Sequence, residues 1–347
     1  MTVITTYDAI NHDQWSALIR DSATGTWFQS PDAYRLYASL PELLEAFAFA
    51  LVNEPKHGLE AISPDALRGV CVGYLTQEPS AAKQWFTRRA IIVGGPCLAD
   101  DSTDEEVKAL MVDVREHLKT KAIYIETRNF NDYSRWREAF TQAGFAYRPH
   151  LNFHLDCCDK TRLWEQLSDN RKRQIRKSEK TQVTVLDPET IGEAEIRMWY
   201  QSLQQLYRTK VKTPLWPLEF FLEAHKQGVG KYMLVSYNDK VIGGSMVVAD
   251  SKSVYEWFEC GLNAEYKDQY PSVMATWAGI QWTNTSALQR YDMMGAGEPG
   301  VAYGVREFKA EFGGTMVEHG RFLCICRPWL YRLGKAGVTL LRAGAKA

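Results

Sequence analysis

The sequence, 347 residues long, lacks the segments that would direct it to a membrane. The stretch Met1–Ile10 has no basic start and no apolar core, so the pattern does not indicate a secretory signal. No apolar run approaches the roughly 20 residues that a membrane-spanning helix needs. Net charge is also small, because 41 basic and 42 acidic residues leave −1. A global field that attracts nucleic acid is therefore excluded, and any anion site must be a local patch. We expect a cytoplasmic protein.

Common catalytic motifs are absent as well. The chain has no Walker A loop, no GxSxG nucleophile turn and no HExxH zinc motif. The segment Gly295–Gly300 lacks the spacing of a dinucleotide-binding loop and contains a proline. The seven cysteines and seven histidines form no cluster with metal-ligand spacing, so we interpret the cysteines as reduced, mostly packed thiols. We expect no metal and no resident cofactor.

What is present is the composition of a soluble globular protein, with 45% hydrophobic and 24% charged residues. The length suits two lobes of roughly 150 residues each. Strand-like runs occur at 47–52, 69–75, 89–93 and 123–126, and again at 233–237, 241–248, 253–260 and 290–293; helical patterns occur at 103–120, 198–207, 217–226 and 272–285. We therefore predict an α/β or α+β protein in which helices flank mixed sheets.

Two pairs of similar sequence segments predict an internal repeat. The string REAFTQAGF aligns with the string REFKAEFGG through its Arg, its Glu and its first Gly, which places Lys309 opposite Phe140. Strand-like runs at 69–74 and 240–245 precede the two strings by similar distances. Because the members of both pairs are separated by nearly the same number of residues, we infer a duplicated scaffold.

The repeat divides the chain into a lobe at 1–152, a lobe at 153–320 and a tail at 321–347, with the seam near Pro149–Cys158. The tail carries six basic residues and no acid, mixed with tryptophan, tyrosine and leucine. A basic amphipathic helix of this kind can lie on anionic lipid. We predict a terminal helix packed on the body; peripheral contact with the inner face of the membrane through the tail is the alternative.

Lys309 is the main catalytic candidate. It lies between Phe308 and Phe312, after a Gly-rich segment at 295–304 and before a Gly-Gly turn. Glycines let the backbone approach a ligand closely. A lysine held beside a cleft can bind a phosphate or stabilise developing oxyanion charge. The alternative is a solvent-facing helix lysine.

The run NRKRQIRKSEK at 170–180 holds six basic residues and one acid. At about 100° per residue, a helix here turns one basic face away from Ile175. That face comprises Lys172, Arg173, Arg176, Lys177 and Lys180. We predict a groove wall for a polyanion, either the phosphates of a nucleotide-linked substrate or a tRNA acceptor stem. A solvated helix face is the alternative.

The segment Tyr207–Pro214, YRTKVKTP, is predicted to be a loop that ends at a proline. It carries the cations Arg208 and Lys210. Loops that combine aromatic and basic residues often bind ligands, although a plain surface role fits the segment equally well.

Four stretches resemble the FemABX family of non-ribosomal aminoacyltransferases. They read TRLWEQLSDNRKRQIRKSEK, YRTKVKTP, GGSMVVADSKSVYEWFECGLNAEYKDQYPSVMATWAGIQW and YDMMGAGEPGVAYGVREFKAEFGG. The resemblance covers the second lobe, about half the chain, and the first lobe weakly. It implies a fold of two GNAT-like acyltransferase lobes in tandem.

The resemblance also implies a reaction: transfer of an amino acid from aminoacyl-tRNA to an amine of a peptidoglycan precursor. In that family pattern Lys309 contacts the phosphates of the acceptor or the reacting carbonyl, and Phe308 shapes the pocket. An aminoacyl ester is already activated, so neither a nucleophilic residue nor a metal is needed, and positioning and electrostatics carry the rate.

Further substrate-binding residues follow from the same resemblance. Arg208 is similar to the basic loop residue that grips the diphosphate of the precursor, and Tyr255 and Tyr270 fall in the region that lines the acceptor cleft. We count Lys210 and Arg306 with these substrate-binding candidates.

The chain departs from related patterns in two ways. It shows no insertion for the long helical-hairpin arm of some family members, and it lacks the Q/R-x-x-G-x-G/A loop of CoA-dependent acetyltransferases. Two alternatives therefore stay open. One is a GNAT-type enzyme that uses acyl-CoA or another thioester on a sugar or amine. The other is a non-catalytic pair of lobes that binds an envelope precursor or RNA.

Overall fold

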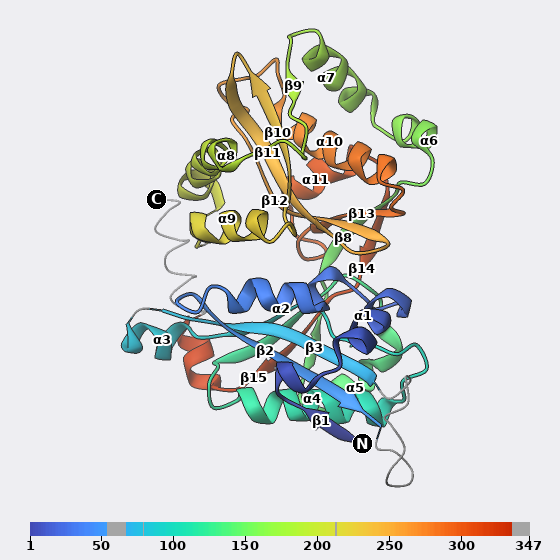
Figure 1. Cartoon of the computed structure of the whole chain (residues 1–347), viewed down its shortest axis with the longest axis vertical. Helices are drawn as coiled ribbons and strands as arrows, with labels where there is room; N and C mark the ends of the chain where they lie inside the picture. The colour runs from blue at the N-terminus through green and yellow to red at the C-terminus, as the bar shows by residue number, and fades with distance from the viewer. Residues whose placement is uncertain (54–66, 79, 212–213, 335–347) are drawn as a thin grey trace. The chain divides into compact units, whose positions relative to one another are not determined.

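The computed structural model describes residues 1–53, 67–78, 80–211 and 214–334. The chain forms two compact units, the first made of Met1–Pro149 with His319–Ala347 and the second of His150–Glu318. Each unit is built on one mixed β-sheet with helices against it (Figure 1). This arrangement confirms the predicted fold class.

The sheet of the first unit has the strand order β1-β2-β3-β4-β6-β15-β7, and β5 pairs with β3. Its strands are β1 (Thr2–Ile4), β2 (Leu44–Val52), β3 (Leu67–Thr76), β4 (Ala90–Gly94), β5 (Cys97–Leu98), β6 (Tyr124–Asn129), β7 (Ala146–Arg148) and β15 (Arg321–Ile325). Its helices are α1 (His12–Asp21), α2 (Pro31–Ala38), α3 (Ala81–Thr87), α4 (Asp104–Leu118) and α5 (Arg137–Gln142). Residues 328–334 are also helical.

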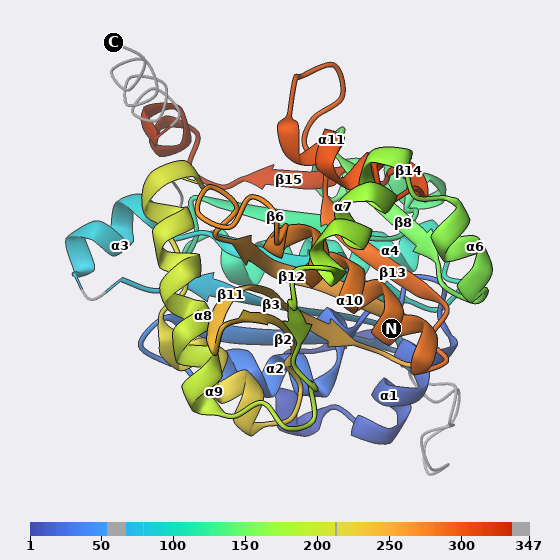
Figure 2. The same cartoon turned by 90° about the horizontal axis from the view of Figure 1, so that it is seen from above.

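The sheet of the second unit has the strand order β14-β8-β13-β12-β11-β10-β9. Several of these strands are labelled in Figure 2. Its strands are β8 (Leu151–Asp156), β9 (Thr184–Val185), β10 (Lys231–Tyr237), β11 (Lys240–Ala249), β12 (Ser253–Gly261), β13 (Arg290–Gly295) and β14 (Thr315–Glu318). Its helices are α6 (Lys160–Glu165), α7 (Asp169–Glu179), α8 (Glu193–Leu206), α9 (Leu218–Lys226), α10 (Pro271–Thr285) and α11 (Gly304–Ala310), and a π-helical turn, η5 (Tyr207–Val211), follows α8.

The helix α4 illustrates how the sequence sets these elements. The Thr103 side chain accepts from the Glu106 N–H, and the Glu106 carboxylate accepts from the Thr103 N–H, so the first turn closes on itself as a capping box. Apolar residues at helical spacing, among them Val107, Leu110 and Val114, are fully buried in the core of the first unit. Each such burial contributes about 1.5–3 kcal/mol.

The two sheets share one plan. Read from the β1 edge and from the β9 edge, the orders match strand for strand, and in each sheet one central pair is parallel, β4 with β6 and β12 with β13. The two aligned strings form α5 and α11, and each helix is followed by a glycine with positive φ, Gly144 at 92° and Gly313 at 83°. Phe140 and Lys309 are both buried on these helices. The topology therefore confirms the internal repeat.

The two repeats exchange their last strands. The strand that follows β7, which is β8, joins the second sheet, and the strand that follows β14, which is β15, joins the first sheet between β6 and β7. The tail predicted from residue 321 onward is wrong at its start, because the structure places Arg321–Ile325 inside the first sheet. Phe322 is 1% exposed and stacks on Phe140 with ring centroids 4.0 Å apart. Residues 335–347 of the expected tail lie outside the described part of the chain.

Candidate functional site

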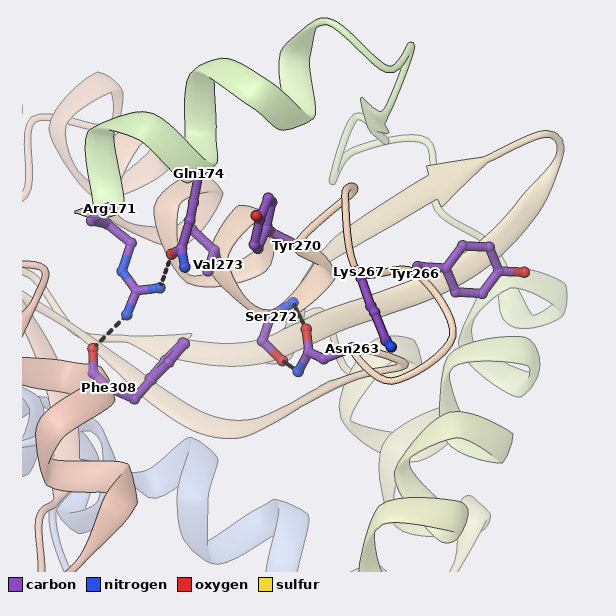
Figure 3. Close-up of a pocket in the computed structure, with 9 residues that line it drawn as sticks. All are labelled: Arg171, Gln174, Asn263, Tyr266, Lys267, Tyr270, Ser272, Val273 and Phe308. Carbon is purple, nitrogen blue, oxygen red and sulfur yellow. Dashed lines mark hydrogen bonds between the residues drawn. The ribbon is translucent and has the colours of Figure 1, made fainter. Parts of the chain in front are cut away.

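The second unit contains a pocket of about 370 Å³. Four segments form it: α7, the loop that follows β12, the first turn of α10, and α11 (Figure 3). The lining residues are Arg171, Gln174, Asn263, Tyr266, Lys267, Tyr270, Ser272, Val273 and Phe308. Aromatic walls with a few polar groups and two cations suit a ligand that has an anionic part.

The floor of the pocket is the N-terminus of α10, whose N-cap residue, Tyr270, makes no side-chain cap. Tyr270 precedes the helix in a left-handed conformation (φ 46°), and Pro271 takes the first helical position. The Ser272 N–H donates weakly to Asn263 Oδ1 at 3.3 Å, and Asn263 Nδ2 donates to Ser272 Oγ at 2.7 Å. In the first unit the equivalent helix, α4, closes its own N-terminus with the capping box described above. The first turn of α10 has only the weak Asn263 contact in place of such a capping box, so this helix end presents positive potential to the pocket.

Arg171 forms one wall of the pocket and is 2% exposed. Its guanidinium carbon lies 4.6 Å and 4.4 Å from the ring centroids of Phe308 and Phe312. The group donates to Phe308 O (2.9 Å) and to Gln174 Oε1 (2.6 Å), and it pairs with Glu311 Oε2 (2.9 Å). Burial lowers the pKa of Arg171 to about 10, against the opposing charge of Glu311. The side chain is therefore a fixed cation at neutral pH.

Lys309 is 8% exposed, so it is not the solvent-facing lysine of the alternative reading. Its ammonium donates to Met293 O and, at 2.7 Å, to Gly295 O at the end of β13. Burial lowers the pKa of Lys309, while the nearby carboxylates of Glu256 and Asp292 oppose that shift. In this arrangement Lys309 fixes the start of the Gly-rich segment, and its predicted contact with phosphate or a reacting carbonyl stays a prediction.

Two carboxyl groups of β12 lie beside this lysine. Glu256 is 7% exposed and accepts from Thr276 Oγ1 at 2.8 Å, and burial raises its pKa. Glu259 Oε1 is buried, and no residue in the described ranges hydrogen-bonds to it. Burial, followed by the charge of Glu256, raises the pKa of Glu259 to about 8; Ser272, Lys309 and Arg171 act in the opposite direction. Ser272, whose hydrogen bond lowers the pKa of Glu259, lines the pocket, so this carboxyl group lies next to the pocket floor.

Glu259 is expected to make stability depend on pH. Its folded pKa of about 8 exceeds the ordinary value of 4.5, so within that window the folded state holds a proton that the unfolded state has released. The free energy of unfolding should therefore fall as pH rises through the window, by about 1.4 kcal/mol for each pH unit. Glu259→Gln has no titrating group at this position. The difference between its free energy of unfolding and that of wild type should therefore shift in favour of the variant from pH 5 to pH 8.

Urea unfolding of the two proteins across that pH range measures the difference. The control is Glu179→Gln, which changes an exposed carboxyl on α7. If the gap between Glu259→Gln and wild type is as flat with pH as the gap for the control, the raised pKa is refuted.

The other predicted substrate-binding residues lie in different places. Tyr270 and Phe308 line the pocket. Tyr255 is fully buried, and its hydroxyl donates to Asp250 Oδ2 at 2.8 Å, which gives it a packing role outside the pocket lining. Arg306 donates to the carbonyl groups of Ala296, Glu298 and Val301 and so braces the Gly-rich segment. Arg208 and Lys210 are exposed on η5 and do not line the pocket; Lys212 and Thr213 of this loop lie outside the described residues.

The basic run forms α7, with Ile175 buried and the cations on the opposite face. Lys172 donates to Glu165 O, Arg173 donates to Asn170 Oδ1, Arg176 lies over the Trp164 ring, and Lys177 pairs with Asp268; Lys180 is exposed at the helix end. The Lys177–Asp268 pair, at 2.7 Å, ties α7 to the loop that encloses the pocket. The predicted tRNA contact of this face stays a prediction.

Sequence reasoning missed Arg171, Glu256 and Glu259. The signal for Arg171 was available, because a residue four positions before Ile175 lies on the same helix face. No comparable sequence signal marked the two glutamates. A bulge at Trp257 adds one residue to β12, so Glu256 and Glu259 reach the same side of the sheet although their spacing of three would place them on opposite sides.

Within the described residues, no group of three or more His, Cys, Asp or Glu side chains is placed to hold a metal ion. No helix in the same ranges has the length and apolar character to cross a membrane. All seven cysteines are free thiols, and five of them are buried.

Comparison with known proteins identifies the fold. Residues 167–309 match the family model described as an acetyltransferase (GNAT) domain. The structure of FemX aligns with a TM-score of 0.70 and 13% identity, covering 96% of this chain and 99% of that chain. The C-terminal domain of a putative lysylphosphatidylglycerol synthetase from Agrobacterium fabrum aligns with a TM-score of 0.56 and 10% identity, covering 94% and 95% of the two chains.

A tandem GNAT protein from the clavulanic acid biosynthesis pathway aligns with a TM-score of 0.55 and 8% identity, covering 94% of this chain and 99% of that chain. No curated protein matches the sequence significantly. At these identities the likeness concerns the fold, and the chain has a FemABX-like tandem GNAT fold.

Proposed function

We propose that this chain, a protein of the tandem GNAT fold, is an acyltransferase that moves an aminoacyl group from aminoacyl-tRNA to an amine of a peptidoglycan or other cell-envelope precursor. One observation carries the proposal: the pocket of the second unit joins a fixed cation, Arg171, to the N-terminus of α10, with the carboxyl group of Glu259 next to its floor. The cation and the helix end favour a phosphate, and the carboxyl group can take a proton from an amine.

The reaction requires two proton transfers. The acceptor is an ammonium in water, and Glu259 takes its first proton, which is later released to solvent. The neutral nitrogen then attacks the ester carbonyl carbon, so a C–N bond forms while the C–O bond to the ribose breaks. The second proton of the nitrogen passes to the departing ribose oxygen. With a pKa near 8 the carboxyl group holds a proton in most molecules at pH 7, so it acts as the base in the ionised fraction, which grows as the pH rises toward 8.

A second candidate, an acyl-CoA-dependent N-acyltransferase, is favoured by one specific observation. The region matched by the acetyltransferase domain model, 167–309, contains the whole pocket lining. A CoA diphosphate could occupy the same N-terminus of α10. The acyl carbon would then leave sulfur instead of ribose oxygen, and the role of Glu259 would be unchanged.

A thermal-shift panel separates the candidates. The ligands are a UDP-linked muramyl peptide, aminoacyl-tRNA, CoA and acetyl-CoA, each tested with wild type and with Arg171→Gln. Loss of a charge-assisted contact should weaken binding of the true ligand by roughly tenfold or more. Arg197→Gln, which changes an exposed arginine on α8 outside the pocket lining, is the control.

Stabilisation by the muramyl peptide and aminoacyl-tRNA, with RNase-sensitive turnover, supports the first candidate. Stabilisation by CoA compounds alone refutes it in favour of the second. Stabilisation without turnover of any donor refutes both enzymes and leaves a binding protein.

A further inference from the structure

The first unit has a cluster of exposed apolar side chains on two elements that are far apart in the sequence. Trp85 and Phe86 of α3 are 45% and 50% exposed, and Trp329 and Leu333 of the helical residues 328–334 are 57% and 56% exposed. The rings of Trp85 and Trp329 are in contact, with centroids 5.2 Å apart. We call these four residues the aromatic patch.

The aromatic patch is unusual for a surface in water. Exposed apolar residues of soluble proteins are normally scattered singly, and gathered ones mark an interaction surface. Each indole also carries an N–H group that prefers a polar neighbour, so tryptophan suits a boundary between an apolar and an aqueous phase.

Positive charge borders the aromatic patch. The guanidinium of Arg327 lies 6.0 Å from the ring centroid of Trp85, and Arg332 is exposed between Trp329 and Leu333 in the sequence. The segment 321–347 contains six basic residues and no acid. Cations beside inserted aromatic rings match the headgroups of an anionic lipid surface.

We propose that the aromatic patch docks the protein on an anionic lipid bilayer, with Trp85, Phe86, Trp329 and Leu333 inserted at the headgroup level and Arg327 and Arg332 against lipid phosphates. This surface belongs to the first unit, whereas the pocket belongs to the second. Docking is therefore independent of the proposed acyl transfer, and either proposal can fail alone.

Vesicle flotation tests the docking. The full chain is mixed with vesicles of phosphatidylcholine alone or of phosphatidylcholine with phosphatidylglycerol. Wild type should float with the anionic vesicles and lose binding as salt rises. The double variant Trp85→Ser, Trp329→Ser should partition about tenfold less, since two large apolar side chains no longer insert. Arg332→Gln should partition about fivefold less to the anionic vesicles.

Met316→Ser is the matched control, because Met316 is 51% exposed on β14 of the second unit. Point substitutions are preferred to a C-terminal deletion. Trp329 lies only a few residues after the strand β15, which belongs to the first sheet. Thermal melting of each variant verifies that the fold is retained.

Equal flotation of wild type and the double variant overturns the proposal. So does the absence of wild-type binding to anionic vesicles. Light scattering tests whether a second copy of the chain covers the aromatic patch. If wild type forms a dimer, the double variant does not, and neither binds vesicles, the patch mediates self-association instead.

Discussion

A chain that ends at Gly320 is expected to lose the folded first unit, whereas a chain that ends at Gly334 should keep it. The first deletion removes β15, which pairs with both β6 and β7. It exposes the backbone groups of both neighbours and removes the buried ring of Phe322 from the face of Phe140. The second deletion leaves β15 and the helical residues 328–334 in place.

The expected loss is large relative to the stability of a domain. Truncation of one buried phenylalanine costs about 3–5 kcal/mol, and a whole domain has only about 5–15 kcal/mol. Phe322→Ala in the full chain should therefore lower the melting temperature clearly and still fold, while the chain ending at Gly320 should lack a cooperative transition for the first unit.

Hydrogen exchange followed by mass spectrometry makes the measurement. Amides of β6 and β7 should lose protection in the shorter chain and keep it in the longer one. Protection of β6 that is the same in both chains would contradict the pairing of β15 with the first sheet.

Lys309→Met is expected to reduce both stability and turnover. The substitution removes the donor to the Met293 and Gly295 carbonyls and leaves Glu256 without its cation. Removal of one partner from a buried charged group costs about 3–5 kcal/mol. Turnover should fall by about 10² to 10³ if the ammonium also faces the developing oxyanion.

The two effects are measured separately. Unfolding in urea gives the stability, and single-turnover rates, taken where the variant is fully folded, give the chemistry. Lys226→Met, the same change at a lysine that is 78% exposed on α9, is the control and should alter neither. An unchanged single-turnover rate in the folded variant would make Lys309 a positioning residue of the Gly-rich segment and would refute a catalytic contact.

The sequence predicted most of the fold because its cues were local. Helix starts such as Thr103, strand alternation and the duplicated Arg-Glu-Gly frame each depend on a few neighbouring residues. The place of β15 could not be found in this way. Five residues that alternate on a strand do not specify a partner strand nearly 200 positions earlier, and the pairing of Phe322 with Thr127 is such a contact.

The candidate site was predicted in part for a similar reason. Lys309, Phe308 and Tyr270 were found because they lie in distinctive strings, and two of them line the pocket. Glu259 was missed because its direction depends on a bulge, and a bulge at Trp257 has no local sequence signal such as glycine. Arg171 was hidden within a run of similar charges and is distinguished only by its helix face.

The exchange of last strands sets an order of events during synthesis. When the ribosome has completed β7, the first sheet still lacks the strand that belongs between β6 and β7, and about 170 further residues precede it. At about 5–20 residues per second, the gap stays open for roughly 10 to 30 seconds. The edges of β6 and β7 are unpaired during that interval and form a template for incorrect strand addition. The first sheet is therefore completed only when the second repeat and then β15 have been synthesised.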